Sequence, residues 1–253
     1  MAEPFLRVEG LTKSYGARAA LRRAGFVLEK GRMLGLVGAS GSGKSTLARC
    51  LAGFERPDEG SMRLDGKVLG GQAPAPQVQL IFQEAAASLN PRFRAEEIVS
   101  EPLEIRRRGT PALRRKMAAE WLEMVGIARA ASAKPALAFS GGERQRLAIA
   151  RALAAEPQLL IVDESLSGLD VMLQAQIAAL LADLRRRLDL TCILISHDLG
   201  LAARLADEIA VMDSGEIVEH APVEQAMGSP RHPRTRELVE ANRLLALAPE
   251  GAA

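Results

Sequence analysis

The sequence predicts an α/β fold in which helices cover a mostly parallel β-sheet. Short apolar runs of strand length recur along the chain, and segments with helical periodicity lie between them. This alternation is typical of parallel sheets, because the helix that connects two parallel strands packs on a face of the sheet. A stretch at residues 95–133 shows helical patterns and no strand, so we expect a separate helical insertion there.

The composition is that of a globular protein that can bury a large core. Hydrophobic residues make up 48% of the 253 residues and charged residues 25%, which excludes a wholly disordered chain. The 33 basic and 31 acidic residues leave a net charge of +2, too small for a protein that binds nucleic acid mainly by charge. Cys50 and Cys192 are far apart in apolar surroundings, so we expect two buried thiols rather than a disulfide or a metal cluster.

The first third of the chain contains a distinct strand followed by a helix. Residues 33–37 form an apolar run that ends at Gly38, as expected of a buried strand. Residues 44–52 have helical character, and Gly53 is a suitable helix stop. Further short strands are predicted at residues 5–11, 26–28 and 78–82.

Two hairpins are predicted from turn residues between apolar runs. Asp65-Gly66 lies between residues 62–64 and 67–69, and this dipeptide favours a two-residue turn. A second hairpin joins residues 209–212 to 216–218 near the end of the chain. The polar tail that follows is expected to be helical in part.

The central and later segments supply the remaining helices and strands. The insertion contains a helix at residues 95–108 and a second that ends near Val125. Strands are predicted at residues 159–162 and 192–195, with a helix between them. The apolar positions of that helix share one face, at residues 173, 177, 180, 181, 184 and 188.

The segment between the strand at 33–37 and the helix at 44–52 predicts a phosphate-binding loop. Residues 38–46 (GASGSGKST) match the pattern G-x-x-x-x-G-K-[ST] in the strand–loop–helix context that it requires. Glycines allow backbone N–H groups to converge on an anion, and a lysine inside the loop disfavours a dinucleotide-binding fold. The predicted contacts to ATP are Gly38, Ser40, Gly41, Ser42, Gly43, Lys44, Ser45 and Thr46.

A pair of carboxylates follows the strand at residues 159–162. Asp163 and Glu164 stand where a parallel strand delivers side chains to the ligand-binding edge of its sheet. Asp163 is expected to bind Mg²⁺ together with the Ser45 hydroxyl. Glu164 is expected to orient or deprotonate the water that attacks the γ-phosphate.

Two more segments, taken with these motifs, resemble the ATPase subunit of ATP-binding cassette (ABC) transporters. Residues 139–143 (FSGGE) open an Arg-rich helix, and His197 follows an apolar strand. The resemblance covers about residues 5–240 and implies the P-loop NTPase fold of ABC ATPases, with an N-terminal antiparallel β subdomain. It implies one domain over residues 1–253: a catalytic core at 1–83 and 136–220, a helical subdomain at about 84–135, and a C-terminal tail at 221–253.

The resemblance also implies a role for individual residues. Tyr15 would stack on adenine, Gln83 would contact ATP and Mg²⁺, and His197 would contact the γ-phosphate beside the catalytic Glu164. The family completes each site with residues of a second subunit. In this sequence those residues are Ser140, Gly141, Gly142, Glu143 and Asp170.

The segment at residues 139–143, called the signature here, departs from the family pattern at two positions. Phe139 replaces the usual leucine and Glu143 replaces the usual glutamine. An acid near the nucleotide would weaken side-chain contacts to it, whereas backbone donors are independent of that side chain. We expect activity to survive.

Several segments resemble the dipeptide, oligopeptide and nickel importer group within the family. They are residues 87–92, 167–171, 174–177 and 229–235. Peptides are the expected solute, and nickel or a metallophore is the alternative. The resemblance implies two transmembrane permease subunits, a second ATPase subunit, identical or different, and an extracytoplasmic solute-binding protein. The expected location is the cytoplasmic face of the bacterial inner membrane. No nucleic-acid partner is expected.

Three other protein classes share this catalytic module. A nucleic-acid-processing ATPase would carry a long coiled-coil or DNA-binding insertion, whereas this insertion has about 40 residues and no sustained heptads. A translation factor would join two cassettes in one chain. An exporter ATPase is the third alternative, and residues 88–92 and 232–233 argue against it.

Overall fold

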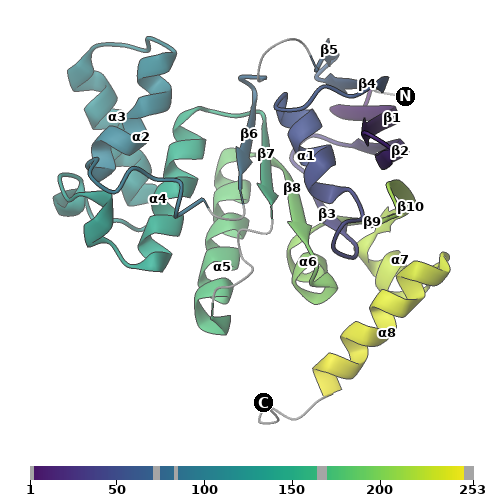
Figure 1. Ribbon diagram of the computed structural model, residues 1–253. Coiled ribbons are helices and arrows are strands. Elements are labelled where there is room, and N and C mark those ends of the chain that lie inside the picture. The colour runs from purple at the N-terminus through teal and green to yellow at the C-terminus, as the bar shows by residue number, and fades with distance from the viewer. Residues whose placement is uncertain (1–2, 71–74, 83–84, 164–169, 248–253) are drawn as a thin grey trace. The chain divides into compact units, whose positions relative to one another are not determined.

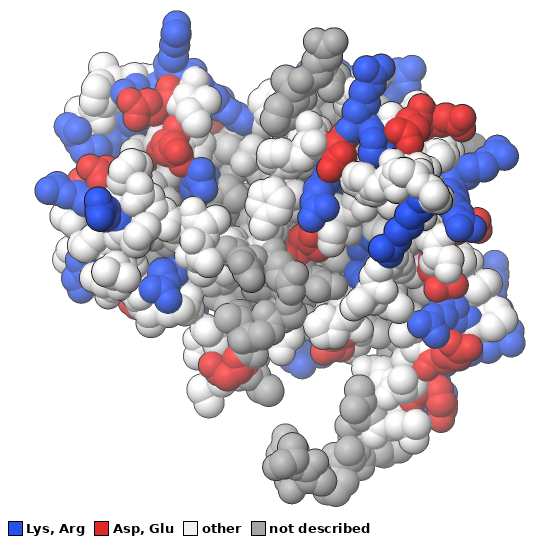
Figure 2. Space-filling model, viewed as in Figure 1, with Lys and Arg blue, Asp and Glu red and all other residues white. Residues whose placement is uncertain are grey.

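The structure is a computed structural model that describes residues 3–70, 75–82, 85–163 and 170–247. It divides into two compact units, which are described separately (Figure 1). The first unit combines Met1–Ala75 with Asp189–Ala253, and the second is Pro76–Leu188. Across the described residues, basic and acidic side chains are interspersed on the face shown in Figure 2.

An antiparallel sheet in the first unit has the strand order β2-β1-β4-β5. Strands β1 (Leu6–Tyr15) and β2 (Arg18–Leu28) pair from Leu6↔Leu28 to Tyr15↔Arg18, with register shifts between. Both are longer than predicted, because the register shifts and the positive φ of Arg23 (54°) interrupt the alternation of buried and exposed residues. The remaining strands are β4 (Glu59–Leu64) and β5 (Lys67–Val68).

The hairpin between β4 and β5 has the predicted turn. Arg63 pairs with Val68 and Leu64 with Lys67, which leaves two residues to reverse the chain. Asp65 and Gly66 both have positive φ, at 49° and 71°. These are the requirements of the type I′ turn that Asp-Gly favours, so this prediction is confirmed.

The parallel strands of the first unit lie side by side in one sheet. Strand β3 (Met33–Val37) lies between β8 (Thr191–Ser196) and β9 (Glu208–Asp213), and both pairings are parallel. Strand β10 (Glu216–Pro222) adds to β9 in the antiparallel direction. Every residue of β3 and β8 is buried, as expected of strands covered on both faces.

The described residues of the first unit form four helices. Helix α1 (Lys44–Ala52) has the predicted bounds, and its stop residue Gly53 has φ 78°. The others are α6 (Leu199–Leu205), α7 (Val223–Gly228) and α8 (Pro233–Leu247). Helices α6, α7 and α8 cover an apolar cluster around β9, which consists of Val37, Leu199, Ala202, Ile209, Val211, Ala221, Ala226 and Val239.

Where the structure describes it, the second unit forms a parallel strand pair and four α-helices. Strands β6 (Val78–Ile81) and β7 (Leu159–Asp163) pair from Val78↔Leu159 to Ile81↔Val162. Helix α2 packs against both α3 and α4, and α4 contacts α5. The bounds are α2 Ala95–Ile105, α3 Pro111–Met124, α4 Gly141–Ala154 and α5 Val171–Leu188, with 3₁₀ turns at Arg129–Ala131 and Ala136–Ala138.

The helical insertion forms as predicted in residues 95–133, although its first helix is shorter. Helix α2 ends at Ile105 instead of residue 108, because Arg107 adopts a positive φ of 52°. The proposed subdomain boundaries at residues 84–135 remain a prediction.

Both cysteines are buried thiols that form no disulfide, as predicted. Burial raises the pKa of the Cys50 thiol to about 11, so it stays protonated and unreactive at neutral pH. Within the described ranges, no three His, Cys, Asp or Glu side chains converge as a metal centre. None of the described helices has the length and apolar character needed to cross a bilayer.

Candidate nucleotide-binding site

The backbone of the phosphate-binding loop, residues 38–46, is folded tightly against its own chain. A Cβ on Gly38 would lie 2.1 Å from the carbonyl oxygen of Met212, and one on Gly43 would lie 2.4 Å from that of Ala20. Both glycines also have positive φ, at 155° and 112°. Glycine is therefore required at these two positions by the fold, in addition to any approach of a phosphate.

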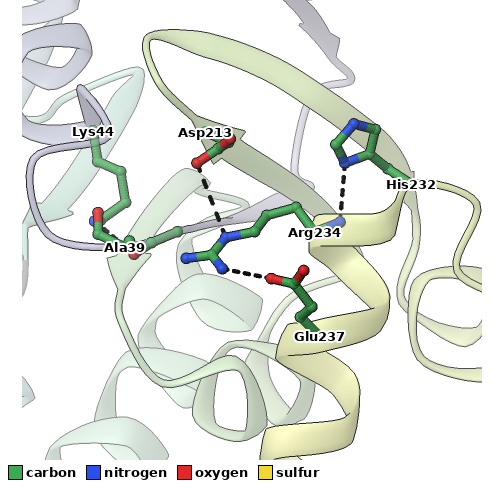
Figure 3. Close-up of polar contacts among 7 residues, drawn as sticks. Ala39, Lys44, Asp213, His232, Arg234 and Glu237 are labelled. Atoms are coloured by element: carbon green, nitrogen blue, oxygen red, sulfur yellow. Dashed lines mark hydrogen bonds and ion pairs between the residues drawn. The ribbon is translucent and has the colours of Figure 1, made fainter.

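The polar groups inside this loop are arranged to receive an anion. Lys44 is only 4% exposed, and its Nζ donates to the carbonyl oxygens of Gly38 (2.9 Å) and Ala39 (3.0 Å) (Figure 3). The Ser42 hydroxyl is buried and finds no hydrogen-bond partner among the described residues. Helix α1, which follows, has neither a side-chain N-cap nor an acidic residue in its first turn. The positive end of the α1 helix dipole therefore faces the loop without a local negative charge to offset it, and the loop fits the ATP that the sequence predicts.

Tyr15 lies at the end of β1, close to the first turn of α1. Burial of the phenol raises its pKa most, and the charge of Glu55 and a hydrogen bond to it raise it further, whereas a hydrogen bond with Thr46 lowers it. The Lys13 ammonium stands 5.6 Å from the ring centroid. Tyr15 as a whole remains 44% exposed, so its side chain can be reached by a base for stacking.

His197 follows the strand next to the one that leads into the phosphate-binding loop. Val37 and Ser196 are partners in the parallel pairing of β3 and β8, so Gly38 and His197 emerge at the same edge. The Ser196 hydroxyl accepts a hydrogen bond from the Asp198 N–H at 3.0 Å. These contacts fix the backbone around an exposed imidazole.

The second unit carries the predicted carboxylate site. Asp163 is buried at the end of β7, and the pairing of Ile81 with Val162 makes β6 and β7 end together. Gln83, Glu164 and residues 167–169 fall outside the described ranges, so their predicted roles stay predictions. Asp170 caps α5, where its Oδ1 accepts the Leu173 N–H at 2.9 Å.

The signature begins helix α4 with a reciprocal cap. The Ser140 hydroxyl accepts the N–H of Glu143 at 3.3 Å, and the Glu143 carboxylate accepts the N–H of Ser140 at 2.8 Å. The backbone hydrogen bond from Ser140 is the main reason that the pKa of Glu143 is lowered. The N–H groups of Gly141 and Gly142 have no acceptor within the helix, so they remain able to bind an anion.

The two signature glycines have different surroundings within the chain. A Cβ on Gly142 would lie 2.5 Å from Cδ1 of Leu173 in α5, whereas a Cβ on Gly141 would meet nothing within 4 Å. The packing of α4 on Leu173 therefore favours glycine at position 142, because a larger residue would push the leucine side chain aside. Gly141 has no such requirement within the chain, which fits a position that an external ligand approaches.

Alanine substitutions at these two positions should have unequal effects on stability. Gly142→Ala forces the flexible Leu173 side chain to move and should cost about 1 kcal/mol of unfolding free energy. Gly141→Ala should cost nothing, because its site is open. Urea denaturation of both variants measures the difference, and equal loss in both would contradict this account of α4 and α5.

The turn between β9 and β10 contacts the phosphate-binding loop, a contact that the sequence does not reveal. The Gly215 N–H donates to the Ser42 carbonyl at 2.9 Å, and the Gly215 carbonyl accepts the Arg22 N–H at 2.8 Å. The turn residues predict a hairpin, but no local pattern indicates contact with a loop more than 160 residues away in the chain. A hollow of about 520 Å³ lies beside it, lined by Ala17, Arg18, Ala19, Arg22, Gly41 and Ser214.

Comparisons with known proteins identify the family. The family model described as "ABC transporter" matches residues 21–167. A putative peptide import ATP-binding protein of Brucella ovis is 41% identical over 248 residues, covering 94% of this chain and 78% of that protein. The nickel import ATP-binding protein NikE of Rhodospirillum rubrum is 39% identical over 253 residues, covering 94% of this chain and 91% of that protein.

A solved structure shows the same fold. It is the ATP-binding cassette MJ0796 in a dimeric post-hydrolysis state bound to ADP and Pi. It is 27% identical with a TM-score of 0.74, and the match covers 86% of this chain and 98% of that one. The predicted ABC ATPase fold is confirmed. The chain belongs to the ABC transporter family, of which it is an ATP-binding, ATP-hydrolysing domain.

Proposed function

We propose that this chain binds and hydrolyses ATP to power an importer in the bacterial inner membrane. Di- or oligopeptides are the proposed solute, and nickel or a metallophore is the alternative. The observation that carries the ATPase function is the phosphate-binding loop, with Lys44 buried on its carbonyl groups and an unpartnered Ser42 hydroxyl inside it. The solute class is supported by the two bacterial relatives, whose names refer to peptide import and nickel import at nearly equal identity.

The residues of each unit have separate proposed tasks in hydrolysis. Tyr15 stacks on the adenine, and the backbone of the loop and Lys44 neutralise the phosphates. His197 holds the γ-phosphate, and Glu164 accepts a proton from the attacking water. Gln83 contacts ATP and Mg²⁺.

Mg²⁺ is the proposed cofactor, because it neutralises charge on the phosphates. Ser45 and Asp163, with Gln83, offer the hard oxygen donors that this cation prefers. Few protein ligands are needed, since Mg²⁺ keeps several waters and binds phosphate oxygens in such sites.

A second ATPase subunit is proposed to complete the site. The Gly141 and Gly142 N–H groups at the start of α4 would face the nucleotide of the partner subunit, with Ser140, Glu143 and Asp170 alongside. The open surroundings of Gly141 support this, and so does the dimeric state in which MJ0796 was solved. The second subunit is either a copy of this chain or a different ATPase subunit.

The membrane partner is proposed to be a pair of permease subunits, with the ATPase lying on the cytoplasmic face. The second unit offers an apolar hollow of about 310 Å³. Leu137 stands at this hollow with 71% of its surface exposed. The other residues lining it are Ala86, Ala87, Leu89, Pro91, Ala136 and Arg144.

The function is tested by reconstituting the chain with its permease and solute-binding subunits in liposomes. ATP hydrolysis should rise when the binding protein is loaded with its solute. Stimulation by a peptide supports the first solute class, and stimulation by nickel or a nickel chelate supports the alternative. Solute export from loaded liposomes would instead support the exporter class.

Leu137→Asp should separate hydrolysis from coupling to the permease. A charge in the apolar hollow would remove contact area and cost desolvation, so permease-stimulated ATPase activity should fall at least tenfold, equivalent to about 1.4 kcal/mol. Basal activity of the free subunit should stay unchanged, because the side chain is exposed. Leu113→Asp is the matched control, since Leu113 is also exposed in this unit but does not line the hollow.

A further inference from the structure

The C-terminal motif at residues 229–235 is fixed to strand β10 by a buried carboxylate. Glu219 accepts hydrogen bonds from the N–H of Arg231 (3.0 and 3.2 Å) and from that of His232 (2.9 Å). Burial alone would raise the pKa of Glu219, but its hydrogen bonds outweigh burial and lower it. The carboxylate is therefore ionised at neutral pH, and the start of α8 is held in one place.

This arrangement directs Arg234, in the first turn of α8, toward the turn between β9 and β10. The Arg234 N–H donates to Nδ1 of His232 at 3.2 Å, which orients the start of the helix. Its Nη1 donates to the Glu237 carboxylate at 2.6 Å, and its Nε lies 3.9 Å from Oδ1 of Asp213 (Figure 3). The Nε is buried and makes no hydrogen bond among the described residues, so this ion pair to Asp213 is its link between α8 and the last residue of β9.

The residues on both sides of Asp213 contact the phosphate-binding loop. Before it, the Met212 carbonyl packs so closely on Gly38 that a Cβ there would lie 2.1 Å away. After it, Gly215 donates to the carbonyl of Ser42 at 2.9 Å. In Figure 3, Asp213 appears between the loop that carries Ala39 and Lys44 and the helix that carries Arg234. The β9–β10 turn therefore supports the loop at two points.

We propose that Arg234 is a positioning residue for nucleotide binding, because it holds Asp213 and so keeps the β9–β10 turn against the phosphate-binding loop. The motif at residues 229–235, which resemblance alone links to one importer group, then has a physical task at the ATP site. The inference rests on the proposed function, since it concerns the same site. Several N–H groups of the phosphate-binding loop must point at the same phosphate. If the β9–β10 turn that supports the loop moves, these groups lose their alignment and the affinity for nucleotide falls.

The test compares nucleotide affinity and turnover in Arg234→Gln and wild type. The dissociation constant of a fluorescent ADP analogue and the KM for ATP should rise about threefold to fivefold, the range of a partly exposed ion pair. The kcat should change less than twofold, because the groups that react are untouched. Arg234→Lys should recover part of the affinity. Asp213→Asn should show the same rise, and the double variant should be no worse than either single one.

Arg243→Gln is the control, because it removes the same charge from the same helix, and its guanidinium donates to the Met227 carbonyl instead (3.4 Å). Thermal unfolding separates lost folding from lost positioning. The inference is overturned if wild type binds nucleotide and Arg234→Gln and Asp213→Asn bind it equally well. It is also overturned if the two effects are additive or if Arg243→Gln weakens binding equally. A wild-type chain that binds no nucleotide would overturn the proposed function itself.

Discussion

Lys44→Ala should weaken ATP binding by at least a hundredfold. The Nζ is buried and donates to the carbonyls of Gly38 and Ala39, so it supplies a fixed positive charge inside the phosphate-binding loop. Charge-assisted hydrogen bonds to phosphate contribute about 1.5–3 kcal/mol each, and a loss of about 2.7 kcal/mol corresponds to the hundredfold change. Titration with a fluorescent ATP analogue measures the affinity directly, without a need for turnover.

Lys30→Ala provides the matched control for this experiment. Lys30 is an exposed lysine in the same unit, and its removal changes the net charge equally. Circular dichroism and thermal unfolding establish that Lys44→Ala is folded before its affinity is compared. Wild-type affinity in a folded Lys44→Ala protein would remove the phosphate-binding role from residues 38–46.

The parts of the fold that the sequence predicts well are those set by local chemistry. The bounds of β3 and α1 match because an apolar strand, a glycine-rich loop and a Gly53 stop are consecutive in the chain. The turn at Asp65-Gly66 follows from the φ angles that these residues tolerate. Each of these features is determined within a few residues, so periodicity and turn chemistry suffice.

The parts that the sequence misses depend on distant partners. The first half of β2 is rich in arginine and pairs with β1 through shifted register, so no alternating pattern indicates a strand. Helix α6 has seven residues, too few for a periodic pattern. The contact of Gly215 with Ser42 joins segments that only the folded sheet brings together.

The cap at the start of α4 is a further feature of the site that a local sequence pattern predicts. Ser140 and Glu143 have the spacing of a capping box, S-x-x-E, which alone predicts that the two residues cap α4 reciprocally. The substitution of glutamate for the usual glutamine therefore keeps the local structure of the helix start. The carboxylate is bound to the Ser140 N–H, and the glycine N–H groups between the two residues stay available.

Glu164→Gln should bind MgATP with wild-type affinity but hydrolyse it about a hundredfold to a thousandfold more slowly. The amide cannot accept the proton of the attacking water, and a general base contributes about 10²–10⁴ in rate. The change removes one charge and keeps the shape of the side chain, so binding by Lys44 and the loop should persist. Single-turnover hydrolysis and nucleotide titration measure the two quantities separately. Wild-type turnover would show that another group activates the water.

The same variant shows whether two copies of this chain form the composite site. Because ATP persists in Glu164→Gln, a closed dimer should accumulate if the signature of one copy binds the nucleotide of the other. Multi-angle light scattering should then detect a shift from 27.1 kDa to about twice that mass when MgATP is added. Adding Ser140→Arg to the same variant is the control, since a bulky cation at the start of α4 should block closure without touching the loop that binds ATP. A chain that binds MgATP and stays monomeric would show that a different ATPase subunit supplies the second signature.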